Sequence, residues 1–294
     1  GNRTQIAQEL RQRLDQLLAV ANTRNGDGEF IFAGAQGGSQ PFTRSGGEVV
    51  YRGDSVQREL SIGPGITMRD GDTGDRVFMT IRDGNGVVSA SPVGGNTGGG
   101  YIAVENAVDR SAYDGDTYTV EFLDPENFVV RDSDGVSVQS GPFSAGETIS
   151  FAGVNITLRG EPAAGDQFVV QQAPNQSVFA TLNDLIGALE SSSATPAGAA
   201  AQRQGIDDAL TRLDRIETRF LEVRSDIGGR LNTLDSVEES IAEQSLSVET
   251  LVSEIRDLDY AEAITRLQQE LVTLQAAQQS FVRIQGLSLF QFLR

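Results

Sequence analysis

Carboxylates are the main chemically active side chains in this sequence of 294 residues, which holds 41 Asp and Glu but no Cys and no His. Without thiols or imidazoles, thiolate nucleophiles, zinc sites built from Cys or His, and acid–base catalysis by His are all excluded. Carboxylate pairs of the kind that hydrolyse glycosides stay open by spacing alone, but no pair stands out from the others. We therefore expect no catalytic residues, no metal ligands and no cofactor, and we do not expect an enzyme.

Two acidic turns, at residues 70–75 and 132–135, resemble the start of a calcium-binding loop. The twelfth position counted from Asp70 is Ile81, and the twelfth from Asp132 is Phe143. A calcium loop of the EF-hand type needs a bidentate Glu at that position. The sequence therefore predicts ordinary turns at both places.

A glycine-rich stretch at residues 93–100 is the other candidate for ligand chemistry, because glycine-rich loops can cradle phosphates. No Lys follows it, and it does not lie between a strand and a helix. We interpret it as a mobile loop.

The formal net charge of −18 and the pI of about 4.4 limit the possible partners. A chain with this much negative charge repels the phosphates of nucleic acids and anionic membrane surfaces. We therefore expect neither nucleic acids nor membranes as partners. The longest apolar runs are a few residues, far below the roughly 20 that span a bilayer, so we expect no membrane insertion. The start, Gly1-Asn2-Arg3, has no secretory signal and no Met. We expect that the native N-terminus is missing.

The first element that the pattern predicts is an amphipathic helix over residues 3–24. Its apolar residues recur at steps of three and four and are Ile6, Leu10, Leu14, Leu17, Leu18 and Ala21. Residues 25–28 (NGDG) should stop it, because Gly adopts the left-handed C-cap conformation at no steric cost.

From about residue 42 to residue 173, short alternating runs separated by glycine-rich turns predict strands. The clearest are residues 48–51, 76–81, 117–122, 127–130, 155–158 and 167–170. Asp-Gly pairs at 83–84, 114–115 and 134–135 are typical of hairpin turns. Many short strands with frequent turns predict an antiparallel sandwich or barrel.

Helical periodicity returns near Ser177 and becomes strongest over residues 199–258. A linker at residues 191–198 separates a short helix from this long one. The long stripe runs from Ile206 to Ile255 with charged residues on the opposite face, which predicts a rod with coiled-coil packing. We expect its stripe to share a core with the helix at residues 3–24, and Gly228-Gly229 to be its weak point.

A last helix should begin at Asp259, with Glu262 completing a capping box. Its apolar stripe repeats at steps of four and three, and its other faces carry mostly Gln and Ala. A solitary surface helix would carry more charge, so we expect other chains to cover this one. The predicted subunit-interface residues are Tyr260, Ile264, Leu267, Leu271, Leu274, Phe281, Ile284, Leu287, Leu289, Phe290 and Leu293.

These elements predict an α+β fold, in which both ends of the chain build an elongated helical rod around an inserted antiparallel β domain. We expect residues 1–41 to form the N-terminal part of the rod and residues 42–174 the β domain. Residues 175–258 then form the C-terminal part of the rod, and residues 259–294 a terminal helix.

Four stretches resemble the flagellin superfamily, and within it the hook-associated proteins. Residues 28–34 (GEFIFAG) with Pro41-Phe42 resemble the family's exit from its helical rod, and residues 253–262 (SEIRDLDYAE) resemble its C-terminal signature. The ending at 285–293 (QGLSLFQFL) and the stretches 162–168 and 177–179 are similar to hook-associated proteins rather than to flagellins. The resemblance covers about half of the chain and is weaker over the β insert.

The resemblance implies a structural subunit of the bacterial flagellum, an adaptor between the hook and the flagellin filament. It implies export through the flagellar secretion apparatus without a cleaved signal, and an extracellular location. The implied partners are further copies in a junction layer, a neighbouring hook-associated protein, flagellin and an export chaperone. Members of the family begin with a further helical stretch that pairs with the C-terminal helix and forms an inner tube with it.

Two alternatives stay open at this point. The chain resembles a filament-forming flagellin in its helical ends, although the tail argues against one. The β insert is also long enough to be a carbohydrate-binding or enzymatic module on the surface.

Overall fold

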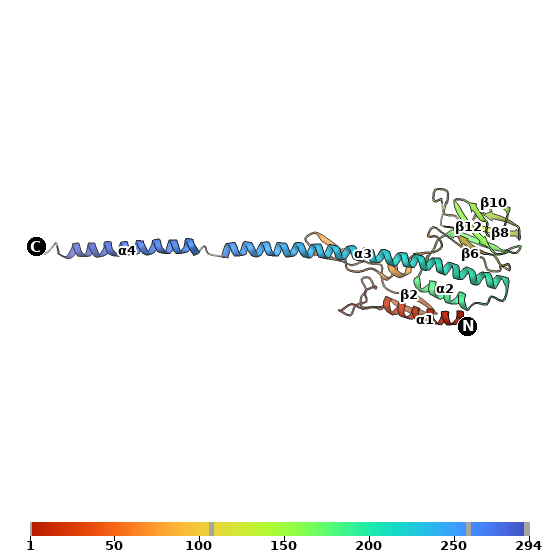
Figure 1. Ribbon diagram of the computed structural model, residues 1–294, viewed down its shortest axis with the longest axis horizontal. Helices are drawn as coiled ribbons and strands as arrows, with labels where there is room; N and C mark the ends of the chain where they lie inside the picture. Colours follow the sequence, from red (N-terminus) through yellow and green to blue (C-terminus); the bar gives the residue numbers. More distant parts are fainter. Residues whose placement is uncertain (1, 106–108, 257–259, 291–294) are drawn as a thin grey trace. The chain divides into compact units, whose positions relative to one another are not determined.

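The computed structural model describes residues 2–105, 109–256 and 260–290, with side chains as far as residue 285, and in it helices stand before and after the described strands (Figure 1). The helices are α1 (Asn2–Ala21), α2 (Val178–Glu190), α3 (Pro196–Arg256) and α4 (Tyr260–Phe290). The chain divides into two units, residues 1–231 and 232–294, so α3 begins in the first and ends in the second.

The β domain of the first unit is built from two antiparallel sheets. The larger has the order β10-β9-β8-β13-β6, formed by Ser137–Pro142, Asn127–Arg131, Tyr118–Asp124, Gln167–Gln172 and Val88–Pro92. The smaller has the order β11-β12-β7, formed by Thr148–Phe151, Val154–Arg159 and Tyr101–Val104. Alternate residues of both sheets enter one core, in which Phe122, Ile156 and Phe168 are fully buried. Of the two predicted arrangements, a sandwich or a barrel, the structure shows the sandwich.

Three two-stranded pairs complete the described strands. Two are hairpins, β1 (Phe42–Ser45) with β2 (Glu48–Tyr51) and β3 (Glu59–Gly63) with β4 (Ile66–Arg69). The third, β5 (Ile81–Arg82) with β14 (Asn175–Gln176), joins the two ends of the β domain. We call this pair the neck, because the chain enters and leaves the β domain through it.

A second core holds the helices of the first unit together. Leu14 and Ala21 of α1 share it with Phe179 of α2 and with Ile216 and Val223 of α3. Aromatic rings fill its centre, where Phe42 lies 5.4 Å from Phe78 and 5.3 Å from Phe179 between ring centroids. Gly205 lets α3 approach α2, since a Cβ there would lie 2.8 Å from the Cβ of Ala188.

The predicted α+β fold class, with an antiparallel β region between helices, is confirmed. The first helix, however, ends at Ala21 rather than at residue 24. The side chain of Asn22 explains the earlier end, because it donates to the Leu18 and Phe42 carbonyls and accepts from the Phe42 amide. Residues 25–29 form a loop instead, in which the Asn25 side chain accepts from the amides of Asp27 and Glu29.

The prediction of a strand at residues 76–81 was wrong for most of this range. Asp75–Met79 form one π-helical turn, and β5 keeps only the end of the predicted range. Val77 and Phe78 are neighbours in sequence and both enter the helical core. A strand would have pointed them to opposite faces, so only a helical turn buries both.

Candidate assembly surfaces

The predicted interface stripe on α4 is exposed to solvent in the single chain. Seven of its residues have described side chains, and each is at least half exposed: Tyr260, Ile264, Leu267, Leu271, Leu274, Phe281 and Ile284. Leu287, Leu289 and Phe290 lie in the last turns of α4, beyond the described side chains, and Leu293 lies outside the described residues. The capping residue Asp259 also falls outside them. Whether the stripe contacts other subunits stays a prediction.

The other faces of α4 carry little charge for a helix of 31 residues. Its charged residues are Glu262, Arg266, Glu270 and Arg283, and the first two form an ion pair with a distance of 2.7 Å. No residue of α4 with a described side chain is buried. The helix therefore has an apolar stripe and no described core of its own to bury it in.

The apolar stripe of α3 divides into a buried and an exposed part. Ile216 and Val223 are buried against the helical core of the first unit, which confirms the predicted shared core with α1 over these turns. Beyond residue 231 the stripe is exposed, with Ile241, Val248 and Ile255 as examples. The predicted coiled-coil packing has no partner helix among the described residues of the chain at these positions.

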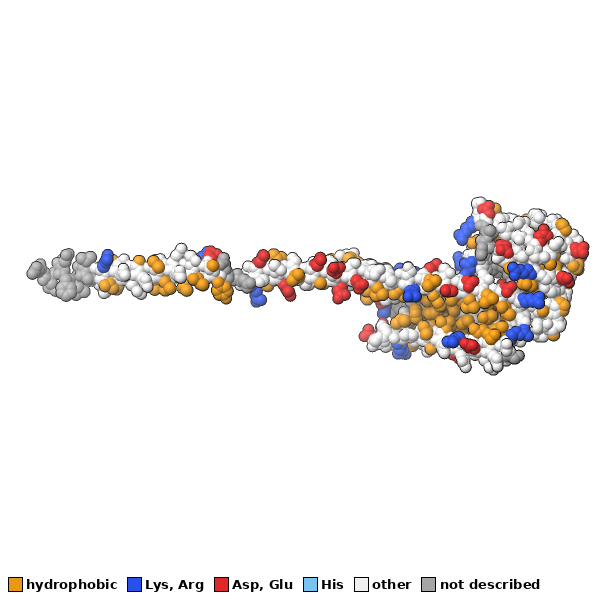
Figure 2. Space-filling model, in the orientation of Figure 1, with side chains coloured by type: hydrophobic (Ala, Val, Ile, Leu, Met, Phe, Trp, Pro, Cys, Tyr) orange, Lys and Arg blue, Asp and Glu red, His pale blue; other side chains and the backbone are white. Residues whose placement is uncertain are grey.

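A third apolar surface lies within the first unit. Figure 2 shows hydrophobic side chains gathered in one patch along the helices of this unit. Of the predicted stripe residues in this unit, Ile6 on α1 and Leu210 on α3 are about half exposed. The other four are partly buried and pack against the helical core: Leu10, Leu17, Leu213 and Phe220. The shared core predicted from the stripes is therefore confirmed at these four positions and was wrong at Ile6 and Leu210, because periodicity cannot tell a covered position from an open one.

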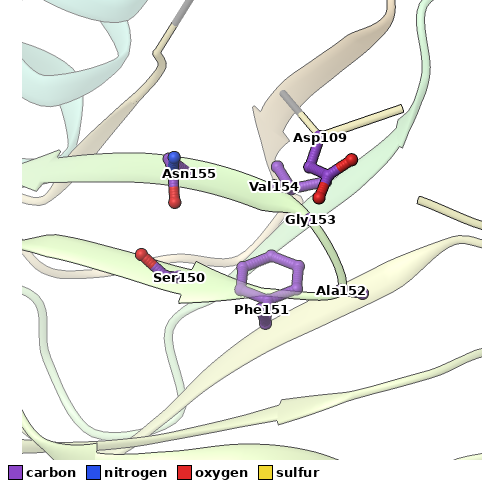
Figure 3. Close-up of a pocket in the computed structure, with 7 residues that line it drawn as sticks. All are labelled: Asp109, Ser150, Phe151, Ala152, Gly153, Val154 and Asn155. Carbon is purple, nitrogen blue, oxygen red and sulfur yellow. The ribbon is translucent and has the colours of Figure 1, made fainter. Parts of the chain in front are cut away.

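A pocket of about 580 Å³ lies at the turn between β11 and β12 (Figure 3). Ser150 and Asn155 lie opposite each other on the two strands, and Asp109 lies beside the turn formed by Ala152 and Gly153 (Figure 3). The Asp109 carboxylate accepts from the Ser111 amide at 2.9 Å and hydroxyl at 2.6 Å, and these bonds lower its pKa. It therefore ties a loop together.

The lining of this pocket does not suit a sugar. The ring of Phe151 is the only aromatic group among its described lining residues, and Phe151 is 6 % exposed. A buried ring offers no face on which a sugar can stack. The pocket therefore gives the carbohydrate-binding alternative no support.

The two acidic turns bind arginines and backbone amides. Asp72 is buried and accepts from Arg76 at 2.8 Å and from Arg230, while Asp70 pairs with Arg58 at 3.0 Å. In the second turn, Asp132 accepts from the Val136 amide at 2.8 Å. No group of three or more potential metal ligands occurs in the described part of the chain.

The glycine-rich stretch is a loop, as predicted, but it is tied to the neighbouring strands. The buried Asp166 carboxylate accepts from the amides of Thr97, Gly98 and Ala163. A Cβ at Gly98 would lie 2.4 Å from the Ala163 amide, so glycine is needed there for close packing of backbone against backbone.

Comparisons with known proteins all find components of the bacterial flagellum. Residues 204–293 match the family model of the bacterial flagellin C-terminal helical region, and residues 94–172 match the D2-like domain of flagellar hook-associated protein 1. The crystal structure of FlgL from Xanthomonas campestris is 31% identical, with a TM-score of 0.80 over 86% of this chain and 82% of that one. The chain belongs to the FlgL family.

Two further flagellar proteins are similar to this chain over most of its length. The flagellar junction protein FlgL from Legionella pneumophila is 29% identical, with a TM-score of 0.74 over 85% of this chain and 79% of that one. Flagellar hook-associated protein 3 of Escherichia coli strain K12 is 24% identical over 99% of this chain and 66% of its own length. The chain thus spans about two thirds of that curated relative.

Membership of the FlgL family confirms the resemblance found in the sequence and makes the chain a flagellar component. FlgL structures share its α+β fold. Its relatives are structural proteins of the flagellum. None of the helices in the described residues is long and apolar enough to cross a bilayer.

Proposed function

We propose that this chain is a structural subunit at the junction between hook and filament, with no catalytic role. The observation that carries the proposal is the similarity of this chain to FlgL structures. One of them is named as the flagellar junction protein. The exposed stripe of α4 supports it, since an adaptor between two lattices needs surfaces that neighbouring subunits cover.

The proposed mechanism is burial of the α4 stripe by sibling subunits. Fully burying a Leu, Ile or Phe side chain contributes about 1.5–3 kcal/mol, so burial of the stripe offsets part of the conformational entropy that is lost when the helix becomes ordered. An isolated helix held by no tertiary contact is marginal in water. Association and ordering of α4 are therefore coupled.

The predicted segments take separate parts in this proposal. Residues 259–294 line the inner tube, and residues 1–41 and 175–258 form the next shell. Within the predicted residues 42–174, the β domain beyond the neck faces outward. The partners are further copies of the chain, a neighbouring hook-associated protein below and flagellin above, with a chaperone before export. The chain reaches the outside of the cell through the flagellar secretion apparatus without a cleaved signal.

A filament-forming flagellin is the main alternative within the superfamily. The two proposals differ in one property, because flagellin grows long filaments alone and a junction protein stops at a short layer. Electron microscopy of the purified full-length protein at high concentration distinguishes them.

The proposal is tested by complementing a strain that lacks its own junction protein. Removing residues 260–294 abolishes filament attachment while the first unit stays folded, because no residue of α4 with a described side chain contributes to either core. Leu271→Asp has the same effect, since it places a charge in the stripe. Gln269→Asp, on the opposite face of α4, is the matched control and keeps attachment. If the truncated chain still joins hook to filament, the stripe is not the assembly surface.

A further inference from the structure

The β domain contacts α3 through a glutamine side chain, which bonds the backbone of a strand in the way that a neighbouring strand would. The side-chain oxygen of Gln204 accepts from the Ile102 amide at 2.7 Å, and its nitrogen donates to the Ile102 carbonyl at 2.8 Å. Ile102 belongs to β7, the edge strand of the smaller sheet. Gln204 thus satisfies the open edge of β7 in the way that a further strand would.

Two further side chains on the same face of α3 extend this contact. Asp208 lies one turn after Gln204 and accepts from its side-chain nitrogen at 2.8 Å. Arg212 lies one turn further and donates to both carboxylate oxygens of Asp83, at 2.6 and 3.1 Å, and to Asp184 of α2 at 2.9 Å. Asp83 follows β5 directly, so Arg212 connects α3 to the neck.

The Asp208 carboxyl lies in a half-buried position between these groups. Burial raises its pKa from 3.8 to about 6, although the hydrogen bond from Gln204 and the charge of Arg212 oppose the rise. The charges of Asp83 and Asp207 add to it. The carboxyl therefore titrates in a range in which an exposed Asp is already ionised.

We propose that Gln204, Asp208 and Arg212 form a latch between α3 and the β domain, and that the protonation state of Asp208 sets how tightly it closes. When the latch opens, the carboxyl enters water. Closing is then favoured by the neutral acid and opposed by the buried carboxylate.

The direction of the pH effect follows from this difference. The pKa of Asp208 is about 6 in the closed state and near 3.8 in the open state, where the carboxyl is in water. The latch is therefore tightest below pH 3.8. It loosens as the pH rises between the two values and changes little above the upper one. A difference of about two pKa units corresponds to roughly a 100-fold change in the opening equilibrium.

Other charged groups on the neighbouring elements define the controls. The charged ones are Asp207 and Arg215 on α3, Asp83 at the neck, Asp184 on α2, and Glu105 directly after β7, and the neutral phenol of Tyr101 lies at the start of β7. Arg212 has a raised pKa and, like Arg215, which bonds the Gly84 carbonyl at 2.7 Å, keeps its charge over the whole range. A pH effect from any of the acids would survive removal of the Asp208 carboxyl.

The test is amide hydrogen exchange of the full chain between about pH 4.5 and pH 7.5, read at Ile102 and corrected for the intrinsic exchange rate. Ile102 donates to Gln204, so its protection factor reports latch closure directly. We expect the protection factor of Ile102 to fall at least tenfold as the pH rises. The protection factor of Val120, in the core of the larger sheet, should stay constant.

Three variants decide the cause. Asp208→Asn cannot ionise, so Ile102 stays protected at both pH values, whereas the matched variant Asp207→Asn keeps the wild-type profile. Gln204→Ala removes the protection of Ile102 at every pH and validates the probe. A flat wild-type profile overturns the proposal even if no variant folds, and so does a pH dependence that persists in Asp208→Asn.

Discussion

Phe78 shows at the residue scale how one side chain joins parts of the chain that are distant in sequence. Its ring centroid lies 5.0 Å from that of Phe32, 5.9 Å from that of Phe179 and 6.0 Å from that of Phe220. These rings come from the loop after α1, from α2 and from α3. The π-helical turn at Asp75–Met79 places Phe78 among them.

Replacing Phe78 by Ala should therefore destabilise the first unit strongly. Truncating a buried Phe leaves a cavity and costs about 3–5 kcal/mol, which we expect as a loss in the free energy of unfolding measured in urea. Phe281→Ala on α4 is the matched control: its side chain is 62% exposed, so the change should stay below about 0.5 kcal/mol. Equal effects of the two substitutions would contradict the assignment of Phe78 to the core.

The same residues show what the sequence predicts at this scale and what it does not. The stripe residues Ile216 and Val223 were assigned to the core and are buried in it. Phe78 was placed on a strand, because alternation over so few residues fits a strand as well as a helical turn. The roles of Gln204 and Asp208 depend on a contact across about 100 residues, which no local pattern can indicate.

At the scale of elements, α2 illustrates how a helix start is fixed locally. Ser177 is its N-cap, and the serine hydroxyl accepts from the Ala180 amide at 2.9 Å. Thr181, also buried, bonds the Ser177 carbonyl at 3.0 Å through its hydroxyl. These bonds position Phe179 for the aromatic core.

Removing the cap should weaken the first unit measurably. Ser177→Ala leaves the Ala180 amide without its partner, and the loss of an N-cap costs about 1 kcal/mol. We expect a lower midpoint in chemical denaturation with an unchanged slope. Ser280→Ala, on an exposed position of α4, should leave the midpoint where it is.

Elements were predicted well where periodicity is long or turns are marked. The long helix was expected over residues 199–258 and runs over Pro196–Arg256, and β2 occupies the predicted residues. The end of α1 was missed because the decisive group, the Asn22 side chain, bonds a strand 20 residues away. The candidate interface was predicted from low charge on α4. The exposure of Ile6 on α1 and of Leu210 on α3 was not predicted, because exposure depends on tertiary packing.

At the scale of the whole molecule, charge and apolar surface act against each other. The net charge is −18, and residues 232–256 contain six acidic residues and one Arg. Copies that approach to bury an apolar stripe also bring like charges together.

Salt should therefore promote self-association of the full chain. Raising the ionic strength from about 0.05 M to about 0.5 M shortens the screening length severalfold, which weakens repulsion and leaves apolar burial intact. We expect larger species in sedimentation velocity at the higher salt, and no such change in a chain that lacks residues 260–294. Dissociation on adding salt would mean that ion pairs between copies dominate the contact.

The neck influences how the β domain can evolve. Asn175 pairs with Arg82 and Gln176 with Ile81, so the ends of the β domain are adjacent in space although more than 90 positions of sequence separate them. An outer module held at two neighbouring points can be enlarged, trimmed or exchanged during evolution without remodelling the helices that carry it. For protein engineers, the same geometry marks a graft point at which a foreign domain with closely spaced termini can replace the native one.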